Sequence, residues 1–103
     1  MDTMLIFKAL SNETRVQILE WLKKPDANFG PQLYLPLNSD FKGGICVGSI
    51  QEKTGLAQSV VSNYLLLLKK AGLLESRRYG QWTYYRRNEE TFLQLADFIK
   101  NEM

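Results

Sequence analysis

Two helical segments separated by a tight break lie in the middle of the chain and constrain its fold more than any other feature. A helix of little more than one turn is expected over residues 49–54, broken by Gly55. A longer helix is expected from Gln58 to Ala71, with Gly72 following where a left-handed backbone is needed. Helices of these lengths with so short a connection are typical of a helix-turn-helix.

A basic β-hairpin is expected directly after this pair of helices. Residues 73–78 and 82–87 are interpreted as two strands, with Gly80 in the turn between them. The second strand is rich in the aromatic and β-branched types that suit a pleated sheet. We expect Trp82 and Tyr84 to pack within the protein rather than to form a platform for stacking bases.

Further helices are expected near both ends of the chain. The first covers residues 2–10, and a second is capped by Ser11 or Asn12 and stopped by Pro25. A final helix is capped by Asn88, and its apolar stripe consists of Phe92, Leu95, Ala96 and Ile99.

Residues 25–43 interrupt the helical pattern with three prolines and several glycines. Apolar side chains such as Phe29, Tyr34 and Phe41 make the segment too hydrophobic for a disordered linker. We expect an ordered loop packed on the domain. It is either a functional element, shaping an effector pocket or supporting a dimer, or a tolerated surface insertion.

The sequence therefore predicts a mainly α fold with a small β-hairpin, a winged helix-turn-helix. The expected order is α-α-α-α-β-β-α, with a long loop between the second and third helices. The length of 103 residues suits a single domain spanning residues 1–103.

The net charge of +2 hides an uneven distribution along the chain. Residues 53–87 contain seven basic residues and only Glu75 as an acidic one, which gives +6, while the rest of the chain carries −4. Such asymmetry indicates either a solvated basic face or a surface that binds a polyanion.

The longer helix of the motif has two chemically different faces. Val61, Leu65 and Leu68 share one face, which should pack on the other helices. Short hydrogen-bonding side chains occupy the opposite and N-terminal face, as a recognition helix in the major groove requires. The candidate DNA contacts on this helix are Gln58, Ser59, Val60, Ser62, Asn63 and Lys69.

The hairpin supplies the remaining candidate DNA contacts, Arg77, Arg78 and Arg86. Arginine suits phosphate contacts along a neighbouring groove. The alternative is that these arginines pair with Glu75 across the strands and only solubilise a sheet edge. At the level of function, the alternative is a winged-helix module that binds an acidic protein partner without touching DNA.

Several blocks of the sequence resemble the ArsR/SmtB family of bacterial repressors. These blocks are FKALSNETRVQIL (residues 7–19), TGLAQSVVSNYL (54–65), LKKAGL (68–73) and GQWTYY (80–85). The resemblance covers nearly the whole chain except residues 25–43. It implies a homodimer formed through the first and last helices, and repression of transcription that is relieved by a ligand, most often a metal ion.

The recognition helix departs from the family pattern at three positions. Ala57 replaces the usual capping serine, which should cost the helix start about 1 kcal/mol unless another group caps it. Asn63 and Tyr64 replace a pair of histidines. Asn63 can still read an adenine edge, and we expect the bulkier Tyr64 to lean towards the hairpin.

The sensor region departs further, because many metal-sensing members carry Cys-x-Cys where this chain has only Cys46. The chain also contains no histidine. Zinc and soft-metal sites need three or four such ligands, so we expect no metal and no cofactor. Cys46 is interpreted as a small buried hydrophobe or as a redox or effector site, and a small-molecule effector of unknown identity remains open.

The remaining expectations concern the class and location of the protein. No nucleophile–base pair and no glycine-rich phosphate loop is present, so we do not expect an enzyme. The chain carries no secretory signal and no apolar run long enough to cross a bilayer, which predicts a cytoplasmic protein without membrane contact. Double-stranded DNA is the expected partner.

Overall fold

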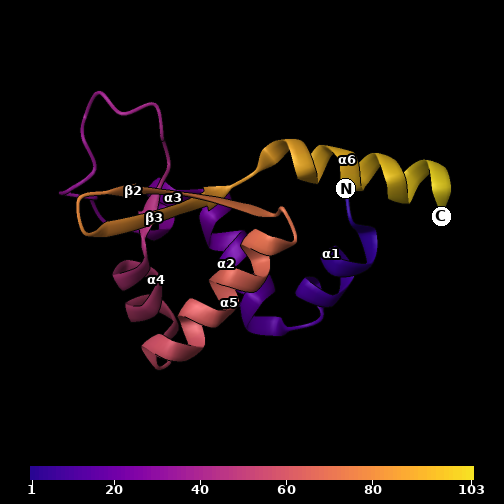
Figure 1. Cartoon of the computed structure of the whole chain (residues 1–103), viewed down its shortest axis with the longest axis horizontal. Helices are drawn as coiled ribbons and strands as arrows, with labels where there is room; N and C mark the ends of the chain where they lie inside the picture. The colour runs from indigo at the N-terminus through magenta and orange to yellow at the C-terminus, as the bar shows by residue number, and fades with distance from the viewer.

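A computed structural model describes all 103 residues of the protein (Figure 1). Its elements are α1 (Thr3–Leu10), α2 (Glu13–Lys23), α3 (Pro25–Asn28), β1 (Ile45–Cys46), α4 (Val47–Thr54), α5 (Gln58–Lys70), β2 (Leu74–Tyr79), β3 (Trp82–Arg87) and α6 (Glu89–Glu102). This order confirms the predicted fold class, a mainly helical winged helix-turn-helix, and adds two short elements to it.

The first added element is α3, which occupies the start of the segment expected to be a loop. Pro25 does follow the end of α2, as predicted, but it also opens the next helix. Proline is tolerated in a first helical turn because its missing N–H would have no partner there. The expectation of a loop from residue 25 is therefore wrong for the first four residues.

The second added element is β1, which turns the hairpin into a three-stranded antiparallel sheet of order β1-β3-β2. Ile45 lies opposite Tyr85, and Cys46 lies opposite Tyr84. Two residues are too few for an alternating pattern to be recognised in a sequence. The helix expected over residues 49–54 begins at Val47, directly after this strand.

The hairpin register determines which side chains share a face of the sheet. Arg77 lies opposite Tyr84 and Arg78 opposite Thr83, while Gly80 adopts a φ of 60° in the turn. Because successive side chains of a strand point to opposite faces, the two neighbouring arginines lie on different sides of the hairpin.

A cluster of 14 buried residues joins the helices to the base of the sheet. Val61, Leu65 and Leu68 of α5 are completely buried, together with Ile18 of α2 and Ile50 of α4. The predicted inner face of α5 is thereby confirmed. Its partners lie on α1, α2 and α4.

The caps and the last helix match the sequence analysis only in part. The Asn12 side chain accepts the Arg15 N–H at 2.9 Å and caps α2, as expected. Asn88 occupies the N-cap position of α6, but its side chain makes no capping hydrogen bond, which corrects that prediction. Figure 1 shows α6 lying above α1 and extending away from the hairpin. No helix is both long and apolar enough to cross a membrane.

The segment from α3 to β1 arches over the hairpin on the side opposite α4 and α5 (Figure 1). Phe41 anchors it with an exposed fraction of 1%. Tyr34 stacks on Trp82 with ring centroids 4.7 Å apart, so Trp82 packs against another side chain, as predicted, but at the surface, with 38% of it exposed. Leu33 and Leu37, in contrast, are exposed.

The tight packing of Gly44 against Phe41 gives a stability prediction. A Cβ atom at Gly44 would lie 2.6 Å from Cδ2 of Phe41, a ring that is buried and has little room to move. We expect Gly44→Ala to lower the free energy of unfolding by about 1–3 kcal/mol, measured by urea denaturation.

Gly48 in α4 is the matched control, because a Cβ atom there meets nothing within 4 Å. Gly48→Ala should raise stability by about 0.5–1 kcal/mol through the helical preference of alanine. Equal stabilities of the two variants would contradict the packing described around Phe41.

Candidate nucleic-acid interface

The turn between α4 and α5 is built by a glycine and a threonine. Gly55 closes α4 in a left-handed conformation with a φ of 72°, and its N–H donates to the Gln51 carbonyl at 3.0 Å. The Thr54 hydroxyl donates to the same carbonyl at 2.9 Å and accepts the Leu56 N–H at 3.2 Å. This turn holds the start of α5 at the molecular surface.

The outward face of α5 contains every contact residue that the sequence placed at its beginning. All of them are exposed in the structure: Gln58, Ser59, Val60, Ser62 and Asn63. The structure thus brings these side chains together on one surface. Lys69 is also exposed, but at 1.5 Å per residue it lies about 16 Å further along the helix than Gln58.

The start of α5 has no side-chain cap. Ala57 occupies the N-cap position, and no other side chain replaces the oxygen that a serine would offer. The N–H groups of Gln58 and Ser59 have no acceptor within the protein. Such free N–H groups at the positive end of a helix dipole can bind an anion such as a phosphate.

A hollow of about 350 Å³ separates the start of α5 from the tip of the hairpin. Gln58 and Ser62 line one wall, while Gln81, Trp82 and Thr83 line the other. Arg78 lies opposite Thr83 in the hairpin and therefore shares the face that borders this hollow. It is exposed and has no carboxylate partner, and its Nε donates to the Gly80 carbonyl at 2.9 Å.

Arg77 and Arg86 lie on the other face of the hairpin and bind groups of the protein itself. Arg77 forms an ion pair with Asp40. Arg86 donates to Glu75 at 2.6 Å and to the carbonyls of Asp40 and Lys42 at 3.2 Å. The pairing with Glu75 is the alternative that the sequence left open, and Arg86 has few donors left for another molecule.

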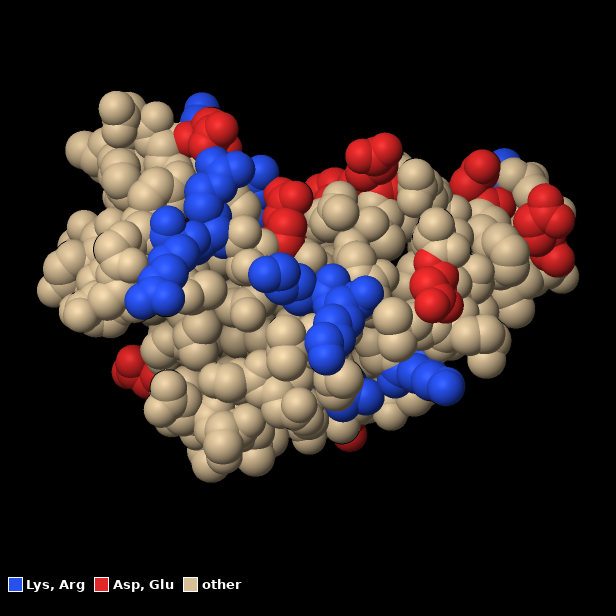
Figure 2. Space-filling model, in the orientation of Figure 1, with Lys and Arg blue, Asp and Glu red and all other residues tan.

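The basic surface is therefore weaker than the sequence alone suggests. Figure 2 shows Lys and Arg side chains along the hairpin and across the middle of this face, while most Asp and Glu side chains lie towards α6. Of the seven cations within residues 53–87, three are paired with carboxylates. The unpaired ones are Lys53, Lys69, Lys70 and Arg78.

Tyr64 points away from the hairpin, contrary to the prediction. Its hydroxyl lies 3.4 Å from Nδ2 of Asn12, and the Arg15 guanidinium lies 5.1 Å from its ring centroid. Arg15 also donates to the Ala9 carbonyl at 2.7 Å and thereby ties α1 to this cluster. Sequence analysis missed this link because its members are about fifty residues apart and share no local pattern.

Cys46 is half-buried at the start of α4, where its Sγ lies 3.1 Å from the Ser49 hydroxyl. Its backbone N–H donates to the Gln32 side chain at 2.8 Å. The thiol is thus less buried than a core residue, and it also borders the hollow beside α5. No three metal-ligating side chains come together in the structure.

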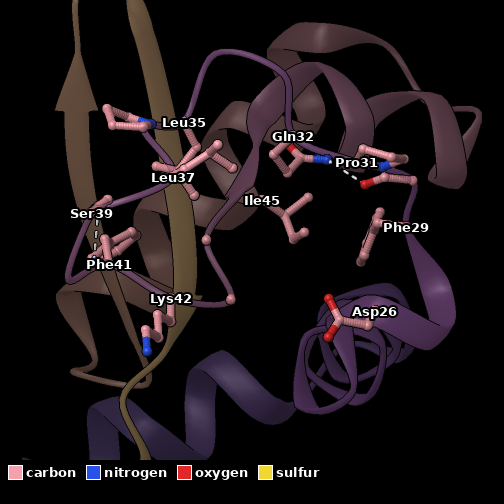
Figure 3. Close-up of a pocket in the computed structure, with 14 residues that line it drawn as sticks. Asp26, Phe29, Pro31, Gln32, Leu35, Leu37, Ser39, Phe41, Lys42 and Ile45 are labelled. Atoms are coloured by element: carbon pink, nitrogen blue, oxygen red, sulfur yellow. Dashed lines mark hydrogen bonds between the residues drawn. The ribbon is translucent and has the colours of Figure 1, made fainter.

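A second hollow, of about 440 Å³, lies beneath the segment from α3 to β1 (Figure 3). Phe29, Phe41 and Ile45 contribute apolar surface to it, while Asp26 and Lys42 lie at its edge. The Tyr79 phenol, on the hairpin beside this segment, has a pKa below its ordinary value. The main cause is its hydrogen bond with Ser39, and Arg77 adds to it.

Comparisons with known proteins agree with this arrangement. Residues 41–76 match the model of the arsR family of bacterial regulatory proteins. The chain is 47% identical, over its whole length and that of the relative, to an uncharacterized HTH-type transcriptional regulator of Bacillus subtilis, YbzH. It is 30% identical to the transcriptional repressor SdpR of the same organism, covering 93% of this chain and 87% of SdpR.

Among solved structures, the chain resembles a homodimeric winged helix-turn-helix DNA-binding domain from Mycobacterium bovis, described as a possible ArsR-family transcriptional regulator. The identity is 30% and the TM-score 0.65, with 96% of this chain and 76% of the other covered. Sequence, fold and the exposed start of α5 agree, and the chain belongs to the ArsR family of bacterial transcriptional regulators.

Proposed function

We propose that this chain is a sequence-specific DNA-binding repressor that acts as a homodimer on an inverted-repeat operator. The observation that carries the proposal is the exposed polar face at the start of α5, with free backbone N–H groups beside it. The similarity to a transcriptional repressor and to a DNA-binding domain supports it. Residues 1–103 would form one cytoplasmic DNA-binding domain without enzymatic activity.

In this proposal α5 enters the major groove with its N-terminal turns. Gln58 and Asn63 read base edges, because their amides can pair with adenine, and Val60 contacts a thymine methyl group. Ser59, Ser62 and the free N–H groups of α5 bind phosphates at the groove edge.

Arg78 is the hairpin residue we assign to the neighbouring backbone or minor groove. Its guanidinium has no carboxylate partner and lies on the hairpin face that borders the start of α5. Arg77 could reach a phosphate only by leaving Asp40, and Arg86 is left out of the proposed set of contacts.

The dimer would form through α1 and α6, whose apolar surfaces are incompletely covered. Met4 of α1 is 65% exposed and Ile99 of α6 is 47% exposed. Phe92, Ala96, Ile99 and Met103 recur at helical spacing along α6, while only Thr91 and Leu95 of this helix are buried. Two-fold pairing of these helices would place the two recognition helices about 34 Å apart.

A mobility-shift assay with DNA from the chain's own promoter tests the proposed function. We expect a shift that weakens steeply with salt, because each phosphate contact releases counterions. Absence of any shift, together with binding to an acidic protein, would favour a protein-interaction module instead.

Two variants separate base reading from phosphate binding. Asn63→Ala should remove about 1–3 kcal/mol of discrimination between the operator and a single-base variant of it. Arg78→Gln should weaken operator and unrelated DNA by the same factor and reduce the salt slope by about 0.9 per subunit.

Lys24→Gln is the control for Arg78→Gln, because it removes the same charge from an exposed position just after α2, outside the hairpin, α5 and the proposed dimer interface. It should leave DNA binding unchanged. An equal loss in the Lys24 and Arg78 variants would mean that overall charge, and not a contact made by the hairpin, determines affinity.

The dimer proposal predicts that Ile99→Asp dissociates the protein, measured by sedimentation velocity, because an unpaired carboxylate is costly in an apolar interface. Leu37→Asp introduces the same group at a fully exposed apolar position and should leave the dimer intact. Leu37 belongs to the segment between α3 and β1, which lies at the end of the molecule opposite α6 (Figure 1). A monomeric wild type, or a dimeric Ile99→Asp, would contradict the assignment of the interface.

A further inference from the structure

The segment around Phe41 packs against the face of the hairpin that is turned away from α5. The Phe41 ring is 1% exposed and lies under two arginines of the hairpin. The Arg77 guanidinium carbon lies 4.9 Å from the ring centroid, and that of Arg86 lies 4.2 Å from it. Cation–π contacts of this kind hold the arginine side chains over the ring.

The backbone on both sides of Phe41 is held equally firmly. The Ser39 hydroxyl accepts the Phe41 N–H at 3.0 Å, as Figure 3 shows, and lies 2.5 Å from the Tyr79 hydroxyl. Arg86 donates to the carbonyls of Asp40 and Lys42. The turn that carries Asp40 is therefore tied to β2 and β3 at several points, independently of the Asp40 carboxylate.

These contacts direct the Asp40 carboxylate at Arg77. The side chain of Asp40 is 84% exposed and that of Arg77 is 42% exposed, so both ions remain in contact with water. An exposed ion pair usually contributes little, because two mobile side chains must be ordered to form it. Here the anchored turn and the contact of Arg77 with Phe41 already restrict the two side chains. Less conformational freedom is therefore lost when the ion pair forms.

We propose that the Asp40 carboxylate competes with DNA phosphate for Arg77. By holding Arg77 on the outer face of the hairpin, Asp40 lowers the affinity of the protein for DNA. The proposal rests on the DNA-binding function proposed above. A phosphate and a carboxylate present similar oxygen pairs to a guanidinium, so one can replace the other. Because β2 is an edge strand of the sheet, a released Arg77 can reach around it towards a DNA backbone.

The test compares Asp40→Asn with Asp26→Asn in the full-length chain. Both variants remove one negative charge from the same segment, but Asp26 forms no ion pair and lies in α3. We expect Asp40→Asn to bind operator and unrelated DNA about two- to five-fold more tightly than the wild type. The salt slope should steepen by about 0.9 per subunit, a readout that a loss of structure would not produce.

A double-mutant cycle assigns the effect to Arg77. In an Arg77→Gln background, Asp40→Asn should change DNA affinity no more than Asp26→Asn does. An effect of Asp40→Asn that persists without Arg77, or that equals the effect of Asp26→Asn, would overturn the proposal. Weaker DNA binding by Asp40→Asn would also overturn the proposal, because the ion pair would then favour DNA binding instead of opposing it.

These outcomes are distinguishable from failure of the proposed function. A wild-type chain that binds no DNA contradicts both proposals. A wild type that binds its operator, with Asp40→Asn and Asp26→Asn giving the same affinity and salt slope, contradicts the competition by Asp40 alone.

Discussion

Burial of one face of α5 is the constraint on which the rest of the structure depends. Val61, Leu65 and Leu68 are completely buried against α1, α2 and α4. Burial of each such side chain contributes about 1.5–3 kcal/mol, so the rotation of the helix about its axis is firmly determined. Side chains on the opposite face must then point outwards, which places Ser59 and Asn63 at the surface without further contacts.

The segment between α3 and β1 determines which arginines of the hairpin remain available to a partner. In the hairpin, neighbouring arginines alternate between two faces, and residues 39–42 cover only one of them. Arg77 and Arg86 are held there, whereas Arg78 remains available beside the start of α5. The net charge of a segment is therefore a poor guide to the charge that it presents to a partner.

Sequence reasoning was accurate where the pattern is local. The helical period of α5, Gly72 and Gly80 at positive φ, and the cap by Asn12 all depend on residues within a few positions of one another. The family resemblance was likewise recognised from local blocks, and it is supported by the relatives.

Prediction failed where partners are distant in the sequence. Asp40 and Arg77 are 37 residues apart, and Asn12 and Tyr64 are 52 apart. Neither pair leaves a periodic signal, because tertiary packing alone brings the partners together. The strand Ile45–Cys46 was missed for the same reason, since only its pairing with β3 makes it a strand.

Selection of binding sites from random double-stranded DNA by the full-length protein tests the central claim most directly. A dimer that presents two copies of α5 should enrich an inverted repeat whose half-sites are centred about one helical turn, roughly 34 Å, apart. Enrichment of no sequence, or of a single unrepeated site, would contradict the account.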